Sequence, residues 1–209
     1  MARRKVKHQA GVPPSGPSRP STGLLVRRTS SGAGWRLVYP RCVRDRAEDI
    51  VEVRAMIKAG ELEIALDELR WLVSGCSEFI EAHTLLGELA LAMGGDLPLA
   101  RGHFGYGYQL GWRTIKRAGQ IGPLFCSHPA NRPFFLAGQG LARCLHQLGK
   151  PHMASEIIES LVTLDPSDPL ELRTMFDRLQ TDDLPMTQLL DAFPEEDQPG
   201  PPGDPSSEH

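Results

Sequence analysis

The stretch AGELEIALDELRWL, residues 59–72, determines which fold the sequence predicts. It has a glycine suited to a turn, a small residue five places later, and large apolar residues at helical spacing after that. The pattern occurs three times, offset by 35 and then 54 residues, at Gly60, Ala65 and Leu69, at Gly95, Ala100 and Phe104, and at Gly149, Ala154 and Ile158. A period of about 35 residues with helix–turn–helix punctuation is typical of helical repeat proteins. The sequence therefore predicts an array of helix pairs.

Apolar residues at three- and four-residue steps extend this helical pattern over most of residues 46–180. The predicted pairs occupy about 46–75, 78–117 and 133–165, and a capping helix follows at 168–180. The expected fold class is all-α, an α-α superhelix of about three helix pairs with a carboxyl-terminal cap.

Three local expectations accompany this assignment. Ile64 is expected to face the core together with the other apolar residues of its helix. Asp168 and Pro169 are expected to begin the capping helix, as an N-cap followed by a proline in the first turn. Residues 118–132 contain several Gly and Pro residues and no period, so they are predicted to be an insertion loop that causes the long second offset.

Both ends of the chain have the composition of tails. Residues 1–34 are rich in Pro, Ser, Gly and Arg, which predicts disorder and makes residues 1–45 a basic tail. The alternative for part of this tail is a short hairpin, in which Leu24–Arg28 pairs with Trp35–Tyr39. Residues 181–209 contain eight acids and no Lys or Arg, so they are predicted to be an acidic, proline-rich tail.

Charge is distributed unevenly along the chain. Residues 1–46 contain 11 Lys and Arg against one acid, whereas residues 47–209 contain 12 Lys and Arg against 25 acids. A basic tail on an acidic body has two interpretations, sequence-independent contact with nucleic-acid phosphates or a solubilising segment that neutralises the body. No motif of a nucleic-acid-binding fold accompanies the tail, so nucleic acid is the second choice of partner.

Four cysteines (Cys42, Cys76, Cys126 and Cys144) occur without CxxC spacing. The amino terminus is basic but lacks the apolar stretch of a secretory signal, and no apolar run is long enough to span a bilayer. We therefore expect a cytoplasmic protein with reduced thiols and without contact to a membrane.

The repeats resemble the tetratricopeptide repeat family. The best match is the third copy, in which small and aliphatic residues follow in the family's order and spacing: Leu141, Ala142, Leu145, Gly149, Ala154, Ile158, Leu161 and Pro166. The resemblance covers about residues 46–180, and the insertion at 118–132 departs from a regular array. It implies a non-enzymatic scaffold or adaptor that binds a segment of another protein in the groove lined by the first helix of each pair.

The resemblance also implies which side chains line that groove. They are Arg54 and Lys58 from the first pair, Thr84 and Glu88 from the second, and Gln139, Arg143 and His146 from the third. The alternative for each is an ordinary solvated helix face. A separate aromatic group, Tyr106, Tyr108 and Trp112, either packs under the insertion loop or forms an exposed anchor for a partner.

Catalytic and metal sites are not expected. The sequence contains no GxSxG, HExxH or P-loop motif, and the glycines around Gly105 lie in a helical register, which favours close helix packing. His83 and His103 lack an evident acidic or nucleophilic partner. The CxH units at Cys126 and Cys144 have spacing unlike that of structural zinc sites, so we predict no metal and no other cofactor.

Overall fold

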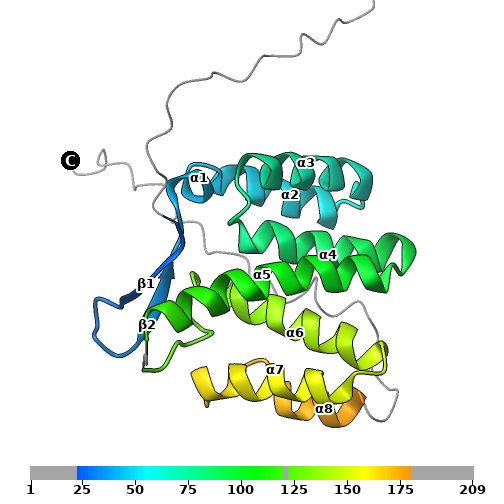
Figure 1. Ribbon diagram of the computed structural model, residues 1–209. Coiled ribbons are helices and arrows are strands. Elements are labelled where there is room, and N and C mark those ends of the chain that lie inside the picture. Colours follow the sequence, from blue (N-terminus) through cyan, green and yellow to red (C-terminus); the bar gives the residue numbers. More distant parts are fainter. Residues whose placement is uncertain (1–22, 120–121, 180–209) are drawn as a thin grey trace, which may run out of the picture.

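The computed structural model describes residues 23–119 and 122–179. Within these residues the chain forms a two-stranded sheet followed by eight helices (Figure 1). The elements are β1 (Leu25–Arg28), β2 (Trp35–Val38), α1 (Arg41–Arg44), α2 (Ala47–Lys58), α3 (Leu62–Gly75), α4 (Ile80–Gly94), α5 (Leu97–Arg117), α6 (Arg132–Gln147), α7 (Pro151–Leu164) and α8 (Leu172–Leu179). Residues 1–22 of the predicted basic tail and the whole predicted acidic tail, residues 181–209, fall outside the described residues.

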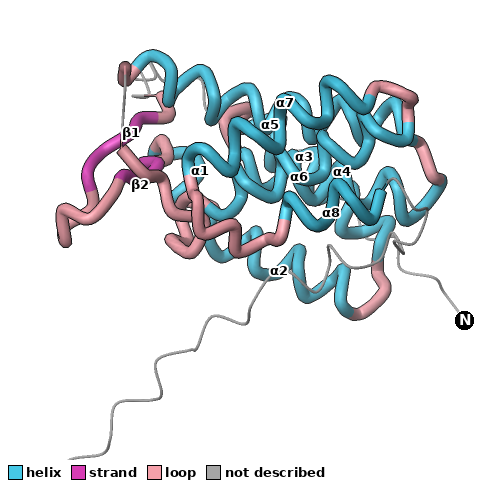
Figure 2. Tube along the Cα trace, turned by 90° about the horizontal axis from the view of Figure 1, so that it is seen from below, coloured by secondary structure: helices cyan, strands magenta, loops and turns pink. Residues whose placement is uncertain are grey.

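Consecutive helices are neighbours in space. Each helix from α2 to α7 packs against the next one in the chain, and α8 packs against α6 and α7. α4 also packs against α6, so these two helices lie in one layer. In Figure 2 the longer helices run alongside one another, and the hairpin projects from one end of the bundle. The prediction of a mainly helical chain with sequential packing is confirmed.

The hairpin corrects the all-α prediction to mainly α. β1 and β2 are antiparallel, with Leu25 opposite Val38 and Arg28 opposite Trp35. A two-stranded hairpin is marginal by itself, but Leu24 and Leu37 are buried in the core. Tertiary packing therefore orders part of a stretch for which composition predicts disorder.

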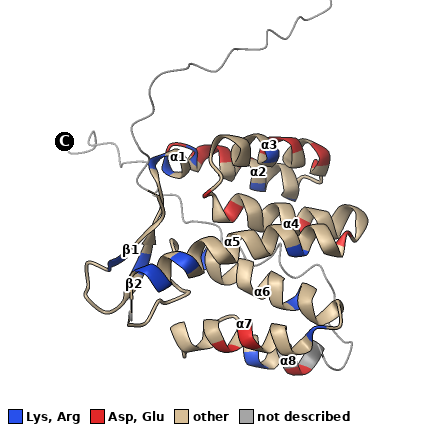
Figure 3. Ribbon diagram, viewed as in Figure 1, with Lys and Arg blue, Asp and Glu red and all other residues tan. Residues whose placement is uncertain are grey.

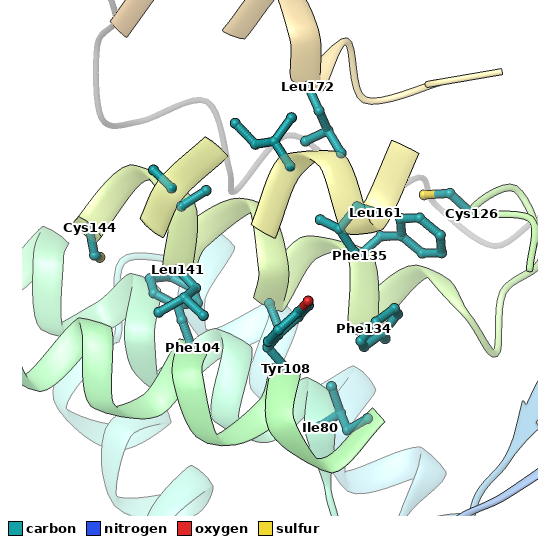
Figure 4. Close-up of a cluster of buried hydrophobic side chains, with 14 of the residues drawn as sticks. Ile80, Phe104, Tyr108, Cys126, Phe134, Phe135, Leu141, Cys144, Leu161 and Leu172 are labelled. Atoms are coloured by element: carbon teal, nitrogen blue, oxygen red, sulfur yellow. The ribbon is translucent and has the colours of Figure 1, made fainter. Parts of the chain in front are cut away.

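Buried apolar side chains form two clusters. The amino-terminal cluster comes from α1, α2, α3 and one side of α4, and includes Val43, Ile50, Val53, Ile57, Ala65, Leu69, Leu72, Leu85 and Leu89. The carboxyl-terminal cluster joins the hairpin to α5, α6, α7 and α8, and includes Phe104, Tyr108, Phe134, Phe135, Leu141, Leu161 and Leu172 (Figure 4). Tyr39 packs against both clusters.

Glycines allow the close helix contacts of the carboxyl-terminal cluster. A Cβ atom at Gly140 would lie 2.5 Å from the Phe104 ring, and one at Gly111 would lie 2.3 Å from the Phe134 ring. Both distances are far below van der Waals contact, so the side chain of any larger residue at these two positions would overlap the rings. Close packing therefore explains Gly111, whereas a Cβ atom at Gly102 would have no neighbour within 4 Å.

Ile64 is exposed, which contradicts the predicted core position. Ile64 is 58% exposed, whereas Ala65, Leu69 and Leu72 are completely buried. These three lie on one face of α3 at steps of four and three residues, and Ile64 is rotated about 100° from Ala65. One helical face is enough to seal this side of the core.

The capping helix α8 begins at Leu172 and not at Pro169. Asp168 and Glu171 have positive φ angles of 47° and 50°, which interrupt a helical path between them. The Asp168 carboxylate still accepts a hydrogen bond from the Leu172 backbone N–H at 2.8 Å. Asp168 therefore caps α8 as predicted, but it lies four residues before the first residue of the helix.

The described part of the predicted insertion loop is anchored to the core. Leu124 and Cys126 are completely buried. The Leu124 N–H donates to the Leu164 carbonyl at 2.9 Å, and the Cys126 N–H donates to the buried Asp165 carboxylate at 2.7 Å. These bonds hold the segment against the end of α7.

Two of the four cysteines form a disulfide, so the prediction of four reduced thiols is wrong for Cys42 and Cys76. Their Cα atoms are 5.8 Å apart, within the usual range for a disulfide. The bond links α1 to the residue that follows α3, across a separation of 34 residues. Cys126 and Cys144 are free, buried thiols, as expected for small core residues.

Candidate functional site

The first helices of the three pairs, α2, α4 and α6, form the face on which the groove was predicted. Arg54 on α2 forms an ion pair with Glu81 on α4, and the Thr84 hydroxyl on α4 lies 3.5 Å from the Pro133 carbonyl on α6. We call this surface the first-helix face. All seven predicted groove residues belong to its three helices.

Three of the predicted groove residues are buried, although they were expected to be solvent-facing. Thr84 is completely buried, and its hydroxyl also donates to the Ile80 carbonyl at 3.0 Å. Glu88 is 5% exposed and Arg143 is 7% exposed. The close packing of α4 against α6 produces this burial, which a helical wheel of either helix alone does not predict.

The other predicted groove residues are accessible. Lys58 is exposed, and Arg54, Gln139 and His146 are half-buried. On α6, Gln139 lies four residues before the buried Arg143 and His146 three residues after it, so the first-helix face has both accessible and buried polar groups.

Glu88 has an unusual environment for a carboxylate. Neither of its oxygens has a hydrogen-bond partner. Burial raises its pKa to about 8, and the charge of Glu81 adds to this effect, while Arg143 and Arg54 act in the opposite direction. Burial likewise lowers the pKa of the Arg143 guanidinium. Near neutral pH the Glu88 carboxyl is therefore mostly protonated.

The three candidate anchor aromatics have different positions. Tyr106 is 43% exposed, whereas Tyr108 is 4% exposed and Trp112 is half-buried. The Tyr108 ring stacks against Trp112 and Phe134, with centroid distances of 5.9 and 5.4 Å. Figure 4 shows Tyr108 and Phe134. Tyr108 is therefore a core residue, and only Tyr106 presents a large exposed ring.

The structure brings His83 and His103 together, which the sequence did not indicate. Their Nδ1 atoms are 3.4 Å apart, and the His83 ring lies 4.5 Å from the Tyr106 ring. Burial, then the proximity of His103, lowers the pKa of His83 to about 4. Burial also lowers the pKa of His103, with a further contribution from Arg70. Both rings are neutral at neutral pH, which suits packing of α5 on α4.

A concave surface lies between the hairpin and the loop of residues 122–131. Its cavity has a volume of about 530 Å³, and its walls carry hydroxyl groups, two aromatic rings, Arg36 and His128. These residues were not predicted to form a site. Their only shared sequence signal is the absence of acidic residues from 23–44 and from 97–155.

No cluster of three or more His, Cys, Asp or Glu side chains able to hold a metal ion occurs in residues 23–119 and 122–179. In the same ranges no helix has both the length and the apolar character needed to cross a bilayer. No protein-family model matches the chain, and neither a curated protein nor a solved structure matches it.

Proposed function

We propose that this chain is a non-enzymatic scaffold that binds a segment of another protein on the first-helix face. The proposal includes a tetratricopeptide-like superhelix, supported by three consecutive helix pairs and by the contact of α4 with α6. In such an arrangement the first helices present a continuous surface to a partner segment.

The charge state of the first-helix face carries the proposal. Glu81 already pairs with Arg54, and the raised pKa of Glu88 leaves this carboxyl mostly uncharged near neutral pH. With Glu88 uncharged, this carboxyl does not neutralise Arg143, whose guanidinium contributes a positive charge to the face. We infer an acidic partner segment, because complementary charge aligns an extended ligand and accelerates its association.

The accessible residues would make the direct contacts. Lys58 can pair with a partner carboxylate, while the Gln139 amide and the His146 ring can hydrogen-bond to partner backbone groups. Arg143 lies beneath them and would act mainly through its charge. The buried position of Thr84 gives it a role in helix packing instead.

The test is affinity capture with the full-length chain at moderate and high salt. We expect one acidic-segment protein to be retained by the wild type and lost with Lys58→Glu. The matched control is Arg70→Glu, which makes the same charge change at an exposed position of α3. Circular dichroism of each variant excludes unfolding.

Loss of retention with Arg70→Glu but not with Lys58→Glu would place the partner on the other face. Equal retention by both variants would also contradict the proposal.

A further inference from the structure

One end of the molecule combines exposed positive charge with an absence of acids. The hairpin contributes Arg27, Arg28 and Arg36, and the carboxyl-terminal end of α5 contributes Arg113, Lys116 and Arg117, all of them exposed. β1 packs against α5, so the two groups belong to one surface. Figure 3 shows the Lys and Arg of these elements at the hairpin end, with no acidic segment among them. We call this surface the basic end.

The cavity of about 530 Å³ opens within the basic end. Trp35 from β2 and Phe125 from the loop are half-buried and line it, together with Arg36 and His128. The hydroxyl groups of Thr29 and three serines complete its walls. The volume lies within the range of about 300–1,000 Å³ that is usual for small-ligand pockets. Aromatic faces, hydroxyl donors and a guanidinium together suit a base attached to a phosphate.

Asn131 fixes the two walls of this cavity relative to each other. It is completely buried, and its side-chain oxygen accepts a hydrogen bond from the Leu37 N–H at 2.9 Å. Its side-chain nitrogen donates to the carbonyls of Trp35 and Phe125, at 3.0 and 2.9 Å. The two aromatic residues of the cavity are therefore held by one amide, which makes the cavity a preformed feature of the fold.

His128 can donate a hydrogen bond into the cavity. Its Nδ1 atom accepts from the Ala130 backbone N–H at 3.1 Å, which assigns the ring proton to Nε2 in the neutral form. Partial burial, with the charge of Arg36, lowers the pKa of His128 and favours this neutral form. A neutral Nε2–H group suits either a phosphate oxygen or a base acceptor.

Two carboxylates close to the hairpin and the loop already have hydrogen-bond partners. Asp165 is buried and accepts hydrogen bonds from Cys126 and Ser167. Glu78 accepts from the Leu24 backbone N–H. The arginines of the basic end thus keep their positive potential toward solvent.

We propose that the basic end binds single-stranded nucleic acid, with one base in the cavity against Trp35 and Phe125 and the backbone phosphates along the arginines. A base must be unpaired to enter such a cavity and stack on an aromatic face, which favours a single strand over a duplex. The site lies on the hairpin and α5, so it is independent of the protein partner on the first-helix face. It also assigns the contact to the folded domain and not to the basic residues before position 23.

The test is fluorescence anisotropy of the full-length chain with a labelled oligonucleotide of about ten nucleotides, over a range of salt concentrations. We expect the triple variant Arg27→Gln, Arg28→Gln, Arg36→Gln to weaken binding at least tenfold. Its logarithmic salt slope should fall by about 2, because each lost contact to a single strand contributes about 0.7. The matched control, Arg41→Gln, Arg44→Gln, Arg70→Gln, removes three exposed arginines from α1 and α3 and should bind as the wild type does.

A second pair of variants separates stacking from charge. Phe125→Ala should weaken binding about tenfold with an unchanged salt slope, whereas Phe125→Tyr should retain binding because it preserves the aromatic face. A duplex of the same sequence should bind more weakly than the single strand to the wild type.

Three results would overturn the proposal. The first is equal binding by both triple-arginine variants, and the second is a preference for the duplex. The third is loss of binding only when Arg3, Arg4, Lys5 and Lys7 are changed to Gln, which would assign the contact to the amino-terminal segment.

Discussion

The two hydrophobic clusters of this chain are stabilised in different ways. The amino-terminal cluster is mainly aliphatic, comes from short helices, and is closed by the Cys42–Cys76 disulfide. The carboxyl-terminal cluster contains large aromatic rings that lie against glycines on neighbouring helices. The disulfide stabilises the fold by reducing the conformational entropy of the unfolded chain. The contacts between rings and glycines stabilise only the folded state, in which the helices pack closely. One helical chain therefore combines both kinds of stabilisation in neighbouring clusters.

Removing the disulfide should have the largest effect on stability. We expect Cys42→Ser with Cys76→Ser to lower the free energy of unfolding by about 4 kcal/mol, the value for a closed loop of this size. Urea denaturation followed by circular dichroism measures the change. Cys144→Ser is the control for thiol loss in the other cluster. An unchanged unfolding midpoint in the double variant would show that the bond does not stabilise the amino-terminal cluster.

Glu88 lies on α4, the helix that contributes side chains to both clusters. Its replacement tests the free-energy cost of burying a carboxyl there. In the folded state its pKa is about 8, against 4.5 for the ordinary carboxyl, so the folded state retains the proton more strongly. The free energy of unfolding should therefore decrease as the pH rises from about 5 to 8.

In Glu88→Gln this decrease should be smaller, and the variant should be more stable than the wild type at pH 8, by roughly 3 kcal/mol. Urea denaturation at a series of pH values gives both curves. Parallel curves for the two proteins would contradict the assignment.

Glycine substitutions test the carboxyl-terminal cluster. Gly140→Ala should lower the free energy of unfolding by about 2 kcal/mol, because its Cβ atom would overlap the Phe104 ring. Gly102→Ala is the matched control within α5. It should raise stability by about 0.5–1 kcal/mol, since this helical site has space for a methyl group. Thermal unfolding measures the difference in stability between the two variants. Equal stabilities would show that the Phe104 ring can shift to make room for the methyl group.

The smallest effect is expected at Ile64. Ile64→Ala should change the free energy of unfolding by less than about 0.5 kcal/mol, because the side chain is exposed. Leu69→Ala on the same helix should cost about 2–5 kcal/mol, since it leaves a cavity in the amino-terminal cluster. Similar losses in the two variants would mean that Ile64 is covered by another surface in solution.

Much of the helical architecture was predictable, because the apolar spacing of each helix is a local property. The predicted end of the second pair, at about residue 117, agrees with the end of α5, and Asp96 caps the start of this helix through the Leu99 N–H, with Pro98 in the first turn. The start of α8 was wrong because the positive φ angle of Asp168 depends on its surroundings and not on its residue type. The disulfide was missed because a separation of 34 residues has no characteristic pattern.

The candidate sites were less predictable than the fold. The helical register placed Glu88 and Arg143 on the correct helices, but their burial depends on how closely α4 packs against α6. The cavity at the basic end unites the hairpin with a loop more than 80 residues later in the chain. The Asn131 side chain and the hydrogen bond from the Trp35 N–H to the Pro123 carbonyl bring those segments together.

By itself, the sequence determined the helices, their order and the uneven charge, because periodicity, capping residues and composition act over short distances along the chain. The tertiary structure alone decided the disulfide, the pairing of His83 with His103 and the depth of Glu88, and it selected the hairpin that the sequence offers as an alternative to disorder. Each of these depends on contacts between residues distant in sequence, whose free energy exists only when the whole core has formed.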